Sequence, residues 1–205
     1  MTFATLQTEI LDRLGLTSTA ATTRIGRAIN IRYRSITSAP WLDQYRRTVG
    51  SFAMVSASSD ITTTSLEKIE QIVDRNPATD VVLNEVSFEE IAGLTLASAA
   101  SPTRWAVKSA TATGITIILD ILASTTNNLE VRGLATVSDL SGSSVPVIPE
   151  SFHNALVYGV LADEYRKMEK GDIADKYEGM FDKRVDELRL FATKTGDYRL
   201  RGKLE

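Results

Sequence analysis

The chain has 205 residues, 43% of them hydrophobic and 24% charged, which is the composition of one globular domain or of one domain with an insertion. Its formal net charge of -3 is too mild for a protein that binds nucleic acid with its whole surface. With 0 cysteines and 1 histidine, the sequence excludes disulfides, thiol nucleophiles, Cys/His zinc sites and Cys-His catalytic pairs.

The first 41 residues predict two amphipathic helices. Residues 2–14 have apolar side chains at helical spacing, with Thr2 as a candidate N-cap and Gly15 as a stop. A TSTAATT linker follows, and the second helix is expected over residues 23–38, before Pro40. Its apolar positions recur every three or four residues: Ile25, Ala28, Ile29, Tyr33 and Ile36.

The start of the chain does not have the pattern of an export signal. Glu9 and Asp12 lie where a signal peptide needs a basic and then an apolar run, and no segment approaches the ~20 apolar residues of a membrane span. We therefore expect a chain that is made and kept in the cytoplasm.

Residues 42–146 predict a β-rich insertion. Short runs such as LEKIEQIVD and GITIILDI are rich in β-branched residues, and turn signals separate them, which fits five to seven strands. Ser87 and Glu90 form a capping-box pattern at the start of a brief helix that ends at Gly93. The insertion is therefore mainly β structure with one short helix.

The end of the sequence predicts a helical hairpin over residues 147–195. One helix is expected over 149–170 and another over 172–192, with Gly171 and Asp172 as the tight turn between them. Because two helices alone cannot bury an apolar stripe, this hairpin should complete a bundle with residues 1–41. The predicted class is α+β: a helical bundle with a β-rich insertion and an extended tail over 196–205.

Short motifs give little support for catalysis. Ser65 and Lys68 match S-x-x-K, and Lys194 to Gly196 match K-T-G, but the serine precedes a predicted strand and the lysine lies in a charged helix. His153 has no evident partner and suits a capping or surface role. Carboxylate pairs such as Asp182 with Asp186 lie among lysines and arginines, as on a solvated helix face. We expect no enzyme activity, cofactor or metal.

Charge is unevenly spread along the chain. Residues 1–41 hold five arginines against Glu9 and Asp12, residues 42–150 hold seven basic and 13 acidic side chains, and residues 151–205 hold 11 of each. A basic first part and an acidic middle suggest that unlike surfaces meet, within one chain or between copies.

The second predicted helix carries the strongest basic cluster: Arg24, Arg27, Arg32 and Arg34. Arg27 and Arg34 share a side away from the apolar stripe, whereas Arg32 points elsewhere. Arg24, Arg27 and Arg34 are candidates for a subunit-interface or DNA-facing surface. A DNA-binding regulator using residues 17–38 is one alternative, but the linker after Gly15, about nine residues, is longer than a helix-turn-helix normally has.

The last residues combine two apolar side chains with three cations. Tyr198 and Leu200 alternate with Arg199, Arg201 and Lys203 after Gly196, where the helix is expected to end. An extended peptide of this kind could add to a partner's sheet edge or acidic groove. These five residues are our candidates for partner docking.

The layout of the two ends resembles a known family. RIGRAINIRYRSITSAPW and the segment PESFHNALVYGVLADEYRKMEKGDIADKYEGMFDKRVDELR, around a β-rich middle, are similar to the head-to-tail connector adaptors of tailed bacteriophages. Trp41 after the arginine-rich helix, and the hairpin with Tyr165, Tyr177 and Phe181, carry most of the similarity.

The resemblance implies a structural virion protein at the head-tail junction. Such adaptors form a ring, usually of twelve copies, that docks under the portal protein, extends the channel for genomic DNA and offers a surface to tail proteins. They are often monomeric until the portal templates the ring, and their C-terminal segments reach onto the portal. A tail-tube or tail-completion protein is the alternative within this class.

Overall fold

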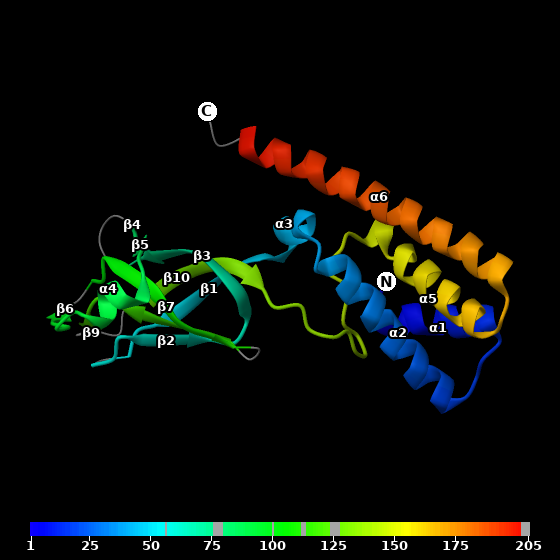
Figure 1. Ribbon diagram of the computed structural model, residues 1–205, viewed down its shortest axis with the longest axis horizontal. Helices are drawn as coiled ribbons and strands as arrows, with labels where there is room; N and C mark the ends of the chain where they lie inside the picture. The colour runs from blue at the N-terminus through cyan, green and yellow to red at the C-terminus, as the bar shows by residue number, and fades with distance from the viewer. Residues whose placement is uncertain (56, 76–79, 100, 112–113, 124–127, 202–205) are drawn as a thin grey trace. The chain divides into compact units, whose positions relative to one another are not determined.

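The computed structural model describes residues 1–205 except 56, 76–79, 100, 112–113, 124–127 and 202–205, and it leaves the side chains of residues 128 and 195–201 undescribed. It divides the chain into a helical unit, Met1–Tyr45 with Val137–Glu205, and a β unit, Arg46–Thr136 (Figure 1). Helices at both ends and strands between them confirm the α+β class.

The described part of the helical unit contains four main helices and three short ones. The main helices are α1 (Phe3–Leu14), α2 (Thr19–Thr37), α5 (Asn154–Lys167) and α6 (Gly171–Arg201). The short ones are η1 (Pro40–Leu42), α3 (Asp43–Arg46), whose last residue belongs to the β unit, and η2 (Glu150–Phe152). None of the helices in the described ranges is long and apolar enough to cross a membrane.

Side-chain caps fix where the first two helices begin. Thr2 accepts a hydrogen bond from the Thr5 amide, and Gly15 ends α1 with a φ of 66°. The Ser18 hydroxyl accepts from the Ala21 amide, so α2 begins at Thr19, not at 23. The predicted linker of about nine residues was wrong, because residues 19–22 already belong to the capped helix.

One apolar core joins the four main helices. Leu6, Ile10, Ile29 and Leu156 are fully buried in it, and Leu188 closes it from α6. Phe181 is buried as well, and Tyr177 packs against the core from its edge. The apolar spacing in the sequence therefore identified the faces along which these helices pack.

The turn between α5 and α6 differs from the prediction. α5 ends at Lys167, and Glu169 takes the left-handed conformation with a φ of 58°. Gly171 is the first residue of α6, and the turn residues are Met168, Glu169 and Lys170. A non-glycine residue thus occupies the position for which glycine was expected.

The C-terminal end of the chain was also predicted wrongly. α6 continues through Gly196 to Arg201, so residues 196–201 are helical, not extended. A glycine inside a helix costs only about 1 kcal/mol relative to alanine, and the residues on either side of it carry the helix on. Residues 202–205, including Lys203, lie outside the described residues.

The β unit contains two four-stranded sheets and one two-stranded sheet among its described residues. The strands are β1 (Arg47–Ala53), β2 (Asp60–Thr63), β3 (Leu66–Asp74), β4 (Val81–Val82), β5 (Asn84–Glu85), β6 (Ser98–Ala99), β7 (Arg104–Thr111), β8 (Gly114–Leu119), β9 (Leu122–Ala123) and β10 (Asn128–Ala135). The orders are β1-β10-β3-β4, β2-β8-β7-β5 and β6-β9. Among the described strands, β5 with β7 and β6 with β9 pair in parallel, and the other pairs are antiparallel.

Inward-facing residues of both larger sheets form the core of the β unit. Trp105, Ile72, Ile117 and Val131 are almost fully buried in it. Gly133 lies at a break in the β10–β3 register, where a Cβ would come within 2.1 Å of the Lys68 carbonyl oxygen. A glycine is therefore required where the two strands approach most closely.

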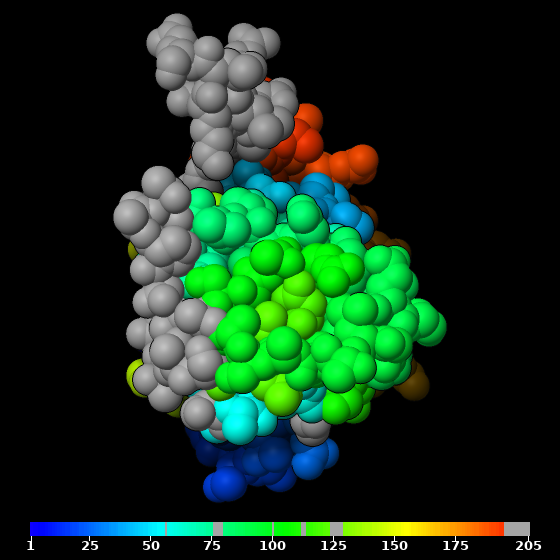
Figure 2. All heavy atoms as spheres, turned by 90° about the vertical axis from the view of Figure 1, so that its left-hand side faces the viewer, coloured from blue at the N-terminus to red at the C-terminus, as the bar shows by residue number. Residues whose placement is uncertain are grey.

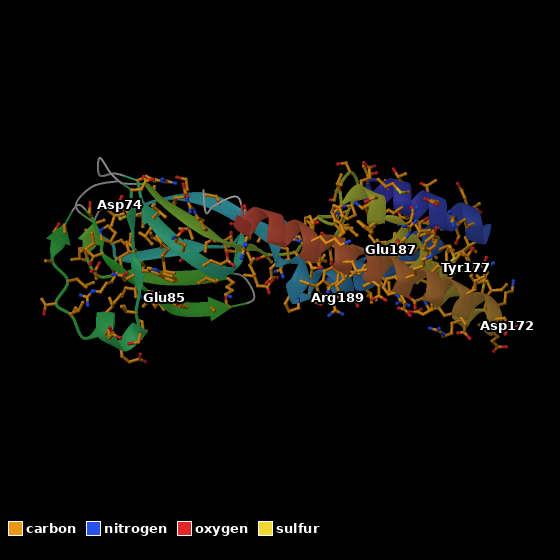
Figure 3. The ribbon with its side chains drawn as sticks, turned by 90° about the horizontal axis from the view of Figure 1, so that it is seen from above. Asp74, Glu85, Asp172, Tyr177, Glu187 and Arg189 are labelled. Carbon is orange, nitrogen blue, oxygen red and sulfur yellow. The ribbon has the colours of Figure 1, made fainter. Side chains whose placement is uncertain are left out.

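The short helix α4 (Phe88–Ala92) forms as the capping box predicts. Ser87 accepts from the Glu90 amide, its hydroxyl donates to the Glu90 carboxylate, and Gly93 follows the last turn. Ile91 anchors the helix against Ala106 and Ile118 of the second sheet. Figure 3 shows α4 at the edge of the β unit, next to the labelled Glu85.

The β unit is narrower than the predicted 42–146. Tyr45, Val137 and Leu140 pack against the core of the helical unit. Asn30 of α2 donates to the Leu140 carbonyl and accepts from the Leu140 amide, at 3.1 and 2.8 Å. The segment after β10 thus returns to the bundle well before residue 146, although its composition is typical of a linker.

Candidate docking surfaces

The outer face of α2 carries an isoleucine between arginines. Ile31 is 66% exposed, and Arg27, one turn before it, is exposed as well. No ion pair joins Arg27 to another residue in the described ranges. Among the described residues, this face combines an exposed apolar side chain, Ile31, with a cation, Arg27, that has no ion-pair partner.

Arg24 is anchored by a buried carboxylate of α5. Its guanidinium lies 2.7 Å from a carboxylate oxygen of Glu164, whose side chain is 1% exposed. Lys167 donates to the other carboxylate oxygen, also at 2.7 Å. Two exposed cations thus compensate one buried anion, and the group keeps a net positive charge at the surface.

Arg32 binds carboxylates within the bundle. Its guanidinium donates to Asp163 of α5 at 2.6 and 2.9 Å and to Glu178 of α6 at 2.8 and 2.9 Å. It also lies over the Phe181 ring, 4.7 Å from the centroid. Hydrogen bonds to Asp163, opposed in part by burial and aided by Glu178, raise the pKa of Arg32. Arg32 therefore joins three helices and is not free for a partner.

Arg34 pairs with the segment that follows the β unit. It donates two hydrogen bonds to Asp139, at 2.7 and 2.5 Å, in an exposed position. The hydrogen-bonded Asp139 carboxylate raises the pKa of the Arg34 guanidinium. Of the three predicted interface arginines, Arg24 and Arg34 are thus ion-paired, while Arg27 has no partner among the described residues.

A groove runs between α2 and α5 beside this face. Two adjoining hollows of about 410 and 420 Å³ share Ala28, Ile31 and Lys167 in their walls. Four cations surround the exposed isoleucine: Arg24, Arg27, Arg166 and Lys167. We call Arg24, Arg27, Ile31, Arg166 and Lys167 the basic groove.

Sequence reasoning found part of the groove and missed the rest. Arg24 and Arg27 were candidates, and the structure brings them together. Ile31, Arg166 and Lys167 were missed. An isoleucine between Arg27 and Arg34, on the polar side of α2, was a visible signal, whereas the α5 cations depend on how the helices pack.

The structure bears in two ways on the alternative that the chain is a DNA-binding regulator using residues 17–38. Only residues 15–18 separate α1 from α2, so the linker length no longer argues against a helix-turn-helix. However, carboxylates hold Arg24, Arg32 and Arg34, and a phosphate backbone would have to compete with them. The arginine pattern is thus largely explained by contacts within the bundle.

The other sequence motifs form no site in the described part of the chain. Ser65 precedes β3 and Lys194 lies on α6, so neither has the helix or strand context that S-x-x-K and K-T-G chemistry requires. No group of three or more carboxylate or histidine side chains suitable for a metal gathers among the described residues. The predicted docking residues cannot be placed in a site, because the side chains of Tyr198 to Arg201 and the whole of Lys203 are not among the described parts of the chain.

His153 occupies the N-cap position of α5, but its side chain makes no capping hydrogen bond, and the surface position that its isolation also suggested was wrong. It is 1% exposed, one ring nitrogen lies 2.9 Å from the Ile148 carbonyl, and the other lies 3.0 Å from the Met1 amino group. The carbonyl can only accept, so Nε2 carries a proton and the neutral ring accepts at Nδ1. Burial lowers the pKa of His153, the Ile148 carbonyl opposes this shift, and the adjacent ammonium adds to it.

We expect acidification to destabilise the helical unit through His153. The unfolded chain takes up the proton near pH 6.5, but the folded chain takes it up only at lower pH. Stability is therefore complete above about 6.5 and is lost as pH falls towards the folded pKa, by up to about 1.4 kcal/mol per pH unit. Urea unfolding at about pH 7.5 and about pH 5.5 measures the loss.

His153→Gln is the control for this pH effect. Its amide can still donate to the Ile148 carbonyl but does not titrate, and the chain has no other histidine. The variant should lose less stability over the same pH interval than the parent. Equal losses in the two proteins would show that His153 is not the titrating group.

Comparison with protein families gives one finding over almost the whole chain. The model of a family described as SU10 adaptor protein matches residues 1–202. The match includes both helical ends and the whole β unit. A comparison with curated proteins gives no match.

Proposed function

Because the chain belongs to the SU10 adaptor protein family, whose members are structural adaptors of the phage head-tail junction, we propose that it forms a ring under the portal protein. The ring extends the channel through which genomic DNA passes and gives tail proteins their attachment surface. Twelve copies and assembly in the host cytoplasm are part of this proposal.

The main support for the proposal is the length of α6, which continues beyond its last contacts among the described side chains of the helical unit. The helix is held to its unit as far as Ala192, which is buried and whose carbonyl accepts a 2.5 Å hydrogen bond from Gln44. Phe191 contacts the Phe152 ring at 5.6 Å, and the helix then continues to Arg201. In Figure 1 this end of α6 extends past the other helices of its unit.

The composition of residues 196–203 suits a docking element. They include Tyr198, Leu200 and three cations, and the helix places Tyr198 and Arg201 one turn apart. We propose that this end of α6 binds an acidic groove of the portal as a helix. This replaces the strand addition predicted from the sequence.

The net charge supports passage of DNA without tight binding. Each chain carries -3, so a ring of copies is acidic overall and repels phosphate. A regulator would bind duplex DNA as the isolated chain, with an affinity that falls with salt. A tail-tube protein would polymerise by itself, so the isolated chain separates these alternatives.

Ending the chain after Thr195 tests the portal contact. We expect the melting temperature to stay nearly unchanged, since Ala192 is the last buried residue among the described side chains of α6, while portal binding weakens by more than about tenfold. Lys183→Glu, on an exposed position of the same helix, controls for charge on α6. Light scattering of chain and portal, separate and mixed, measures assembly. Undiminished assembly of the truncated chain would move the portal contact elsewhere.

A further inference from the structure

An acidic, partly apolar patch lies on the β unit around α4. Phe88 and Leu94 are 37% and 39% exposed, and Glu85, Glu89 and Glu90 are exposed beside them. We call these five residues the acidic patch. In Figure 2 the green spheres, whose range of residue numbers includes α4, are at the surface of the β unit.

The patch is held rigidly but is not neutralised. Ile91 is buried beneath α4, and the Val86 amide donates to the Trp105 carbonyl at 2.9 Å. Within the described ranges, no ion pair or hydrogen bond engages the side chains of Glu85 and Glu89. A rigid surface that exposes an aromatic ring beside free carboxylates suits a protein partner with cations.

The acidic patch and the α2 side of the basic groove each come from a stretch of sequence with one sign of charge, whereas the α5 side of the groove also holds Asp163 and Glu164, which pair with Arg32 and Arg24. Residues 76–103 contain four acidic side chains and no lysine or arginine, whereas residues 13–42 contain five arginines and no acidic side chain. The basic groove complements the acidic patch in charge and shape. It holds Arg27, which has no ion-pair partner among the described residues, further cations, and hollows beside Ile31. Phe88 is an apolar anchor that such a hollow can receive.

We propose that the acidic patch of one copy docks in the basic groove of the next copy. This inference rests on the proposed function, because it names the surfaces that join neighbouring copies in the ring. The two surfaces differ, so the contact is head-to-tail, and repeating it closes a ring when the rotation per copy allows it. Arg27 and Glu89, which have no ion-pair partner among the described residues, lie opposite each other across this contact.

Cross-linking tests the contact, because the parent chain has 0 cysteines and only introduced thiols react. Chains with Arg27→Cys are mixed with chains carrying Glu89→Cys, treated with a short bis-maleimide, and separated on a denaturing gel. The experiment is run at high protein concentration with and without the portal. We expect a cross-linked dimer from the mixture and a ladder of oligomers from a chain that carries both substitutions.

Two controls make the result specific. Asp12→Cys, exposed on α1, paired with Glu89→Cys should give at most about a tenth of the dimer. Reversing the charge with Arg27→Glu should weaken ring formation about tenfold, and adding Glu89→Arg in the same chain should restore it. Lys183→Glu, an equal change of charge on α6, should have little effect.

The outcomes separate this inference from the proposed function. Portal binding without a cross-link between Arg27→Cys and Glu89→Cys overturns the inference but leaves the proposed function standing. The same holds if the chain with both cysteines forms a link only within itself and the mixture of single-cysteine chains forms no dimer. The cross-link without portal binding supports the inference and overturns the docking role. If neither is observed, both are wrong. A control pair that links as well as the test pair also overturns the inference.

Discussion

Replacing Phe181 by alanine should lower the free energy of unfolding of the helical unit by about 3–5 kcal/mol. The ring is 8% exposed, and it fills the space between α6 and α5. A Cβ built on Gly159 of α5 would lie 3.0 Å from the Phe181 ring, which shows how closely the ring approaches that helix. Removing it leaves a cavity that the surrounding helices cannot fill completely.

The measurement is urea unfolding followed by circular dichroism at the helical signal, which reports mainly on this unit. Phe181→Leu is the matched control, because it keeps much of the volume and should cost less than half as much. Phe191, which is 46% exposed, should tolerate alanine at a cost of less than about 1 kcal/mol. A loss below 1 kcal/mol for Phe181→Ala would mean that Phe181 is not a core residue.

Regular elements could be predicted from the sequence because they depend on local spacing. The capping box of Ser87 and the β-branched run of β3 each place an element close to its observed bounds, and the apolar residues of α2 identify its buried face although the predicted start at 23 was wrong. The α5–α6 turn could not be placed, because the preference of glycine for left-handed backbone is statistical and Glu169 occupies that position. The end of α6 was misplaced for a similar reason, since one glycine does not stop a long helix.

The contacts of the arginines could not be predicted from spacing. Arg24 and Glu164, or Arg32 and Asp163, lie far apart in the sequence, and their pairing depends on how α2 and α5 align. Helical periodicity shows that Arg32 points away from Arg27 but not that it reaches two other helices. The burial of His153 likewise depends on residues 144–150 packing beside the start of α1, and no local sequence pattern predicts this contact.

Replacing Arg32 by methionine should destabilise the helical unit by about 2–4 kcal/mol. The Arg32 side chain is 15% exposed, and it pairs with the side chains of Asp163 on α5 and Glu178 on α6, which are 29% and 27% exposed. Methionine keeps the packing of the alkyl stem but leaves Asp163 and Glu178 facing each other without their shared cation. Partial access of water to both carboxylates keeps the loss below that of a fully buried pair.

Arg34→Met is the matched control for this second prediction. Arg34 also donates two hydrogen bonds to one carboxylate, that of Asp139, but both side chains are about half exposed or more, so Arg34→Met should destabilise the unit much less than Arg32→Met does. In the Arg32→Met background, Asp163→Asn and Glu178→Gln remove the uncompensated charges and should recover part of the lost stability. If the two arginine variants lose equal stability in urea unfolding, the three-helix contact of Arg32 adds nothing beyond a surface pair.

The same two residues allow a test of their coupling. Arg32 lies over the face of Phe181, so each side chain helps to hold the other in place. The loss from Arg32→Met and Phe181→Leu together should therefore be smaller than the two separate losses added, by about 0.5–1 kcal/mol. Urea unfolding of the parent, both single variants and the double variant measures this difference. Strict additivity would show that the guanidinium is positioned by its carboxylates alone, and that the ring beneath it serves only to fill the core.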